Sequence, residues 1–312
     1  MIVFDIFLTV FFIVTGIVNY AYKRTNAYYN SHIMNLDFRN PNIGKIIVLG
    51  STYARYAFDG AKSLKIDISN LTLQSQSLLN DLKNFENIKS KITEKNIVFI
   101  VLAPCTLLFE GNHSKIFKFN IPGNTTATFK QKLNYIFPII HIKKIISLLS
   151  DEGRCLDVYD NKNLINDSAA IDEAMKHLTL LWKNMFGLKN LYDTTLSDYN
   201  YQCIKDNKII LEQLVDNCLK KRCSTVIIVP PFSDKLNKYF SDEFVKITLE
   251  ENVKEVKRKY PKLLYLDYRL SSEFQDDAGL FMDGGFLLNR RGSQILIKKI
   301  FGDLKSEFYL NN

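Results

Sequence analysis

Short apolar runs that alternate with amphipathic helical patterns constrain the fold of this chain more than any other feature of its sequence. The runs are rich in β-branched residues and too short for typical helices, so each indicates a buried strand. They lie at residues 45–50, 70–73, 96–104, 224–231 and 262–268. Helical patterns occupy residues 77–92, 202–221, 242–259 and 291–308. This alternation predicts an α/β fold with a doubly wound, flavodoxin-like parallel sheet, whose ligand sites lie at the carboxyl ends of the strands.

The alternation stops in the middle of the chain. Residues 111–200 contain two helix-like segments, 129–149 and 169–186, and we interpret this stretch as a helical insertion that roofs the site or docks a partner. The predicted organisation is therefore an anchor with its flank at residues 1–24, a linker at 25–43, and one α/β domain at 44–312 that carries the insertion.

The N-terminal segment predicts a membrane anchor. Residues 2–19 are mainly apolar and carry only one charge, at Asp5, and the segment is just long enough for a helix across a bilayer core. Tyr20, Tyr22, Lys23 and Arg24 follow, as expected at a membrane interface. A buried core helix is the alternative interpretation. The two basic residues favour a cytoplasmic domain by the positive-inside rule, although that rule is weak for one helix followed by a long domain.

Composition excludes several classes of protein. The net charge is +8, from scattered lysines, with no arginine-rich block and no zinc-finger spacing. This argues against nucleic-acid binding and fits either a solvated lysine surface or attraction to anionic lipids or acidic glycans. The five cysteines are odd in number and form no CxxC motif, so neither a disulfide framework nor a structural metal site is expected. No cofactor motif is present, since no Walker-type loop or GxGxxG follows the first strand.

Three segments combine polar residues with a predicted strand end or helix start. Ser51 and Thr52 follow the first strand on a sharp turn, where a hydroxyl suits either a nucleophile or a helix N-cap. Ser75 and Gln76 lie where the second strand gives way to a helix, as donors to a ligand or as caps. Asp283 precedes the final helix and is either an acid or a turn residue.

These segments, in this order and with residues 229–234 between the last two, resemble the SGNH (GDSL-type) esterase and acyltransferase superfamily. The likeness is strongest to members encoded with cell-surface polysaccharide genes and to the extracellular protein that helps attach D-alanine to teichoic acids. Their first strand ends in Gly-(Asp/Ser/Thr)-Ser, Asn-Leu-x-x-x-(Ser/Gly)-x-Ser-Leu follows the second strand, and Asp-x-x-His-Leu-Asn-x-x-Gly closes the domain. The resemblance covers residues 44–104 and 224–308.

The resemblance assigns roles to residues of this chain. It implies Thr52 as the nucleophile, with Ser51 one residue earlier, and Asp283 as the acidic partner. The predicted oxyanion or substrate-binding residues are Ser75, Gln76 and Asn289. It also implies an extracytoplasmic domain on a single-pass anchor, against the flanking charges.

The chain departs from the family pattern where a general base is required. The histidine position falls on Phe286 or Leu287, neither of which accepts a proton, and loss of general-base help costs about 10²–10⁴-fold in rate. Of the four histidines, only His113 lies near a predicted strand end, and we interpret it as a surface-loop residue.

Two functions therefore remain open: an esterase or O-acyltransferase on cell-surface polysaccharide, and a catalytically degenerate protein that binds a glycan or a membrane acyltransferase partner. An unrelated phosphate-binding domain is the weakest alternative.

Overall fold

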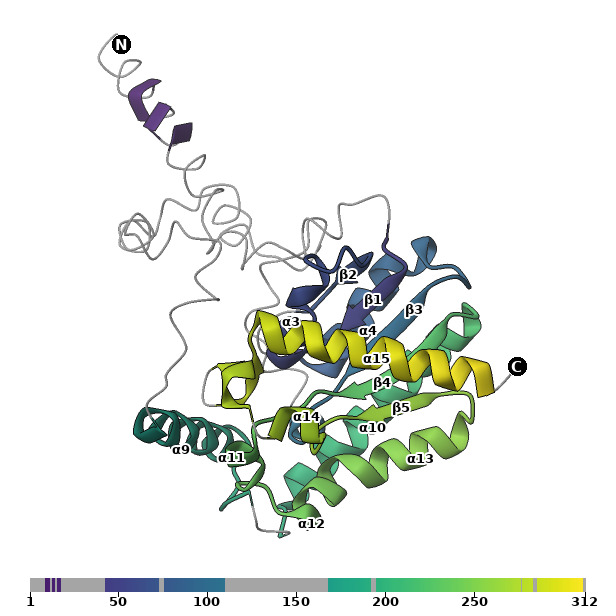
Figure 1. The fold of residues 1–312 in the computed structure, drawn as a ribbon. Coiled ribbons are helices and arrows are strands. Elements are labelled where there is room, and N and C mark those ends of the chain that lie inside the picture. Colours follow the sequence, from purple (N-terminus) through teal and green to yellow (C-terminus); the bar gives the residue numbers. More distant parts are fainter. Residues whose placement is uncertain are drawn as a thin grey trace. The chain divides into compact units, whose positions relative to one another are not determined.

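The computed structural model describes residues 9–11, 13–14, 16–17, 43–72, 76–109, 168–191, 195–275, 277–282 and 285–310 (Figure 1). The chain divides into two units, Met1–Arg39 with Lys115–Asn161 and Asn40–Ser114 with Lys162–Asn312. Of the first unit, only helical residues between Thr9 and Ile17 are described. The predicted helix at residues 129–149 and most of the predicted anchor lie outside the described residues. No helix in the described part of the chain is long and apolar enough to span a membrane.

The second unit is built on one parallel sheet, which confirms the α/β, parallel-sheet part of the predicted fold. Its strands are β1 (Ile46–Leu49), β2 (Ile68–Asn70), β3 (Ile97–Val101), β4 (Ser224–Val229) and β5 (Leu264–Asp267). All pairings are parallel and the strand order is β2-β1-β3-β4-β5, the flavodoxin-like order. The inner strands β1, β3 and β4 are almost entirely buried, as their unbroken apolar runs predict.

Helices cover both faces of this sheet. On one face, α4 (Leu78–Ile88) packs against α10 (Asp198–Lys220), which in turn contacts α13 (Glu251–Lys259). On the other face lie α3 (Thr52–Ala57) and α15 (Arg290–Leu310) (Figure 1). Ser293 of α15 joins these two helices, because its hydroxyl donates to the carbonyl of Ala57 at 2.9 Å and accepts from the Gly60 N–H at 2.8 Å.

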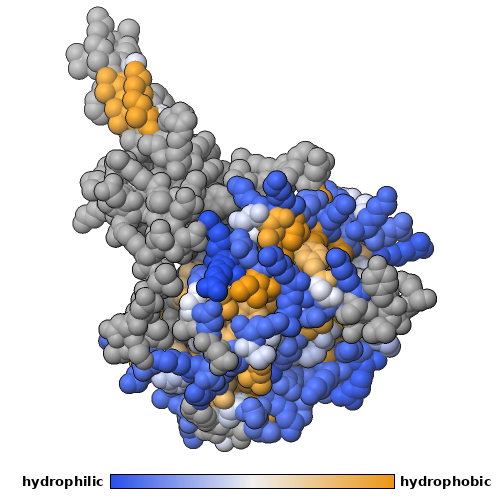
Figure 2. Space-filling view, viewed as in Figure 1, coloured by the Kyte–Doolittle hydropathy of each residue, from blue (hydrophilic) through white to orange (hydrophobic). Residues whose placement is uncertain are grey.

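Two predicted helices differ in detail from the structure. The helix expected at residues 242–259 consists of α12 (Asp242–Val245), the π-helical turn η6 (Lys246–Glu250) and α13, so it is continuous but irregular. In the middle of the chain, α9 (Ser168–Met185) confirms the helix predicted at residues 169–186. The visible face of the described domain is mainly hydrophilic, with apolar residues in small separate patches (Figure 2).

Gly50 makes the turn from β1 into α3 possible. Its φ of +140° is a conformation that residues with a side chain rarely adopt, and an added Cβ would lie 2.7 Å from Ala54 Cβ and 2.8 Å from the Val101 carbonyl oxygen. We expect Gly50→Ala to lower the free energy of unfolding by about 3 kcal/mol or more, because strain and overpacking each cost about 1–3 kcal/mol. Urea unfolding followed by circular dichroism measures this loss.

Gly187 provides the matched control. Its φ is +61°, but no atom lies within 4 Å of an added Cβ, so Gly187→Ala introduces backbone strain without a clash. We expect it to cost about 1–2 kcal/mol. Equal losses in the two variants would contradict the packing role assigned to Gly50.

Candidate functional site

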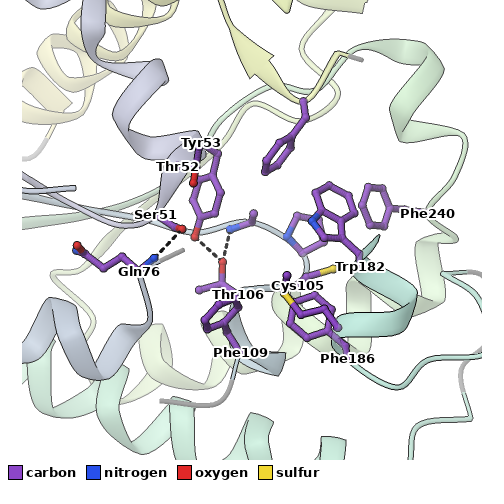
Figure 3. A pocket seen from close by; sticks show the side chains of 14 residues that line it. Ser51, Thr52, Tyr53, Gln76, Cys105, Thr106, Phe109, Trp182, Phe186 and Phe240 are labelled. Atoms are coloured by element: carbon purple, nitrogen blue, oxygen red, sulfur yellow. Dashed lines mark hydrogen bonds between the residues drawn. The ribbon is translucent and has the colours of Figure 1, made fainter. Parts of the chain in front are cut away.

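A cavity of about 100 Å³ opens at the carboxyl ends of β1 and β3. Ser51 and Thr52 line it from the turn after β1, and Pro104, Cys105 and Thr106 line it from the segment after β3 (Figure 3). This is the edge at which parallel α/β sheets bind ligands. The structure thus places both predicted hydroxyl residues beside a cavity.

Six of the fourteen described residues that line the cavity are aromatic. Trp182 of α9 packs edge-on against Phe286, with ring centroids 4.8 Å apart, and lies 5.6 Å from the ring of Phe240. Phe286 also contacts Tyr53, with centroids 6.0 Å apart. Among the described residues that line the cavity, none carries a formal charge at neutral pH, so the cavity suits an uncharged group.

Ser51 bonds across the cavity floor to the neighbouring loop. It occupies the N-cap position of α3, but its side chain makes no capping hydrogen bond. Instead the Ser51 Oγ accepts the backbone N–H of Gln76 at 3.1 Å (Figure 3). Thr52 is the first residue of α3 and lines the cavity beside it.

A second pair of hydroxyls was not selected from the sequence. The Tyr53 hydroxyl and Thr106 Oγ1 lie 2.7 Å apart, and Thr106 Oγ1 also accepts the Ala103 N–H at 2.7 Å (Figure 3). Burial raises the pKa of Tyr53 well above its usual value, so its hydroxyl is neutral and acts as a hydrogen-bonding group rather than as a base. These two residues could have been found from their position in the sequence, because both follow the ends of predicted strands.

A buried carboxylate, also missed from the sequence, lies beneath these groups. Asp81 of α4 accepts the Gly50 N–H at 2.8 Å and a hydrogen bond from the side-chain amide of Gln76. Burial raises the pKa of Asp81 from 3.8 to about 7, and the two hydrogen bonds oppose that rise. Asp81 therefore joins the end of β1 to the loop before α4.

The side chains of Gln76 and Asn289 are both engaged within the protein. The Gln76 amide donates to the Leu71 carbonyl at 3.2 Å and to Asp81, and it extends away from Ser51 (Figure 3). Its backbone N–H is the group that points to the cavity hydroxyl. Asn289 precedes α15, where it donates to the Gly279 carbonyl at 2.6 Å and accepts the Gly292 N–H at 3.0 Å. Asn289 is not among the residues that line the cavity.

Phe286, which follows the predicted acid in the sequence, lines the same cavity. Asp283 and Ser75 lie outside the described residues, but Phe286, three positions after Asp283, lines the cavity. Leu287 is buried in β7 (Leu287–Leu288), which pairs with β6 (Phe281–Met282). Of the two positions at which the family resemblance places a histidine, one therefore contributes a phenyl ring to the cavity and the other belongs to a small buried hairpin.

Histidine is missing from the described part of this cavity. His177 is exposed on α9 and does not line it, and His32, His113 and His141 lie outside the described residues. Within the part of the chain that the structure describes, no three His, Cys, Asp or Glu side chains are grouped so that they could hold a metal ion.

Comparison with known proteins adds a distant structural likeness. No protein-family model matches the sequence, and no curated protein matches it significantly. A solved structure described as a candidate platelet activating factor from Streptococcus pneumonia is similar with a TM-score of 0.45 and 9% sequence identity. The match covers 94% of this chain and 98% of that chain. The site is therefore interpreted from its own geometry.

The raised pKa of Asp81 predicts a pH-dependent stability. Between pH 4 and 7 the folded protein keeps a proton that the unfolded chain has lost, so stability falls as pH rises through this window and levels off above it. A rise from 3.8 to about 7 corresponds to roughly 4 kcal/mol. We expect Asp81→Asn to remove this part of the slope, because the amide oxygen can still accept the Gly50 N–H without carrying charge.

Urea unfolding at several pH values from 4 to 8 measures the effect as the difference between Asp81→Asn and the parent protein. Glu94→Gln, at an exposed acidic residue, controls for the loss of one carboxyl group. A stability difference between Asp81→Asn and the parent that stays constant across the pH range would rule out titration of the buried carboxyl.

Proposed function

We propose that this protein is an SGNH-like domain that binds an acyl-bearing ligand of the cell surface without hydrolysing it by a serine–histidine mechanism. The position of Phe286 carries the proposal. A general base for Thr52 or Ser51 is expected at this side of the cavity, and a phenyl ring cannot accept a proton. The buried carboxyl group of Asp81, in the described part of the chain, is engaged by Gly50 and Gln76.

The cavity favours the acyl part of such a ligand. Its volume is about 100 Å³, whereas an engineered apolar cavity of about 150 Å³ holds benzene. An acyl group of a few carbons fits this space, and a sugar ring stays outside it. The hydroxyls of Ser51, Thr52 and Thr106 supply polar contacts for the ester oxygens.

Ester hydrolysis or O-acyl transfer is the second candidate. The observation that favours it is the shared position of Thr52 and Ser51 beside the cavity, with the Gln76 N–H 3.1 Å from Ser51 Oγ. In this reaction the Thr52 or Ser51 hydroxyl attacks the ester carbonyl, the ester C–O bond breaks, and the alcohol leaves with the hydroxyl proton. Water, or a hydroxyl of the acceptor glycan, then takes the acyl group from the side chain, and Asp283 and Ser75 take the roles that the family resemblance implies.

The cellular setting follows from the sequence resemblance. The resemblance implies that the protein acts in a surface-polysaccharide pathway and has a membrane acyltransferase as its partner. A single-pass anchor at residues 2–19 would hold the domain on the extracytoplasmic side. The ligand is then an acylated glycan or the acyl donor of that partner.

Hydrolysis of p-nitrophenyl acetate separates the two candidates. We expect the parent protein to release nitrophenol no faster than the Ser51→Ala/Thr52→Ala variant, because the described lining of the cavity offers no general base to either hydroxyl. Turnover in the parent that falls at least tenfold in this variant would establish the second candidate instead of the first.

Trp182 allows ligand binding to be measured directly. It is the only tryptophan of the chain and lines the cavity, so its emission reports on occupancy. We expect saturable changes on titration with glucose pentaacetate and none with glucose, because only the ester presents acyl groups.

Thr52→Ile should weaken binding at least tenfold by filling the cavity, whereas Thr93→Ile, before β3 and away from the cavity, should not. Equal responses to both sugars would contradict acyl recognition.

A further inference from the structure

Basic residues gather at the edge of the sheet opposite the cavity. All five strands are parallel, so all begin at the same edge. A basic residue lies in the segment just before every strand. We call this set the basic edge: Lys45, Lys65, Lys95, Lys221, Arg222 and Lys262. A charge distribution that repeats at five separate strand entries is a property of the fold and is not visible as a cluster in the sequence.

The basic edge is available to a partner. Five of its residues are exposed and Lys221 is partly exposed. In the described part of the chain, none of the six forms an ion pair, whereas neighbouring Lys220 and Lys259 are paired with Asp216 and Glu212. Exposed acidic residues at the same strand entries are Asp67 and Glu94. The described residues of this edge therefore carry a net positive charge.

The chain enters the domain at this edge. β1 begins at Ile46, immediately after Lys45. The apolar segment at residues 2–19 precedes β1 in the sequence. Lys23, Arg24 and Arg39 add further positive charge between that segment and β1. The covalent connection from the apolar segment therefore joins the domain at the start of β1, which belongs to the basic edge.

We propose that the basic edge docks on an anionic phospholipid surface. A lysine or arginine close to an anionic leaflet strengthens binding by about fivefold, and several act together. The strands span roughly 15–20 Å, so docking by their amino ends holds the cavity at the far edge, facing away from the bilayer. Soluble or glycan-borne ligands then approach the cavity from the side away from the bilayer. This arrangement does not depend on which chemistry the cavity performs.

Hydrogen–deuterium exchange of the full-length chain tests the orientation. The probes are vesicles of phosphatidylcholine alone and of phosphatidylcholine with one quarter phosphatidylglycerol. We expect the anionic vesicles to slow exchange in peptides covering residues 62–67, 93–96, 220–223 and 260–263. Peptides at the cavity edge, residues 103–109 and 230–236, should exchange alike on both vesicles. The apolar segment is the same in both samples, so the difference between vesicles reports on the basic edge.

Charge reversal supplies the second measurement. Lys45→Glu, Lys95→Glu and Lys262→Glu together should lower the phosphatidylglycerol-dependent part of vesicle binding by roughly a hundredfold, since each lysine contributes about fivefold. The control is the triple reversal of Lys176, Lys183 and Lys189, which changes net charge equally on and just after α9. All six positions are solvent-accessible, and circular dichroism verifies folding of both variants.

Several outcomes would overturn the proposal: equal exchange on both vesicles, slower exchange at the cavity edge, or equal loss of binding in the two triple variants. Slower exchange at the basic edge with heparin but not with anionic vesicles would also overturn it, and would assign the edge to a soluble polyanion.

Discussion

The cavity depends on a buried carboxylate that holds two backbone segments together. Asp81 accepts the N–H of Gly50, the residue that turns the chain from β1 into α3, and it also binds the side chain of Gln76. The backbone of Gln76 in turn donates to Ser51. A carboxylate buried without a cation is costly, and the raised pKa of Asp81 expresses that cost. This free-energy cost arises at the position where the first strand ends and the cavity begins.

The fold was predictable because each strand and helix is indicated by the residue pattern within its own short segment. The apolar runs that became β1, β3 and β4 are continuous, as burial on both faces of a parallel sheet requires, and the intervening helices have a clear apolar side. β2 was placed two residues late because the short strand Ile68–Asn70 contains a serine and ends in a polar residue. The π-helical turn at Lys246–Glu250 was not predictable from apolar periodicity, which continues across it.

The candidate site was predictable only in part, because it is assembled from several distant segments. A hydroxyl after an opening strand is recognisable in sequence, and Ser51 and Thr52 do line the cavity. The role of Asp81 was not recognisable in the sequence, because an acidic residue within an amphipathic helix is usually solvated. Asp81 is buried because α4 packs against the end of β1. Trp182 and Phe240 lie far from both in sequence. Their role in the cavity wall requires knowledge of the tertiary structure.

In a parallel sheet, the residues that follow the strands and the residues that precede them lie at opposite edges. All carboxyl ends share one edge, where hydroxyls and aromatic rings enclose an uncharged cavity, and all amino ends share the other, where lysines follow the preceding helices and turns. The described lining of the cavity carries no charge, as expected where an aromatic wall cannot solvate it, whereas the described cations of the second edge lie in solvent. A single topological rule thus places the cavity and the basic edge at opposite ends of the same strands.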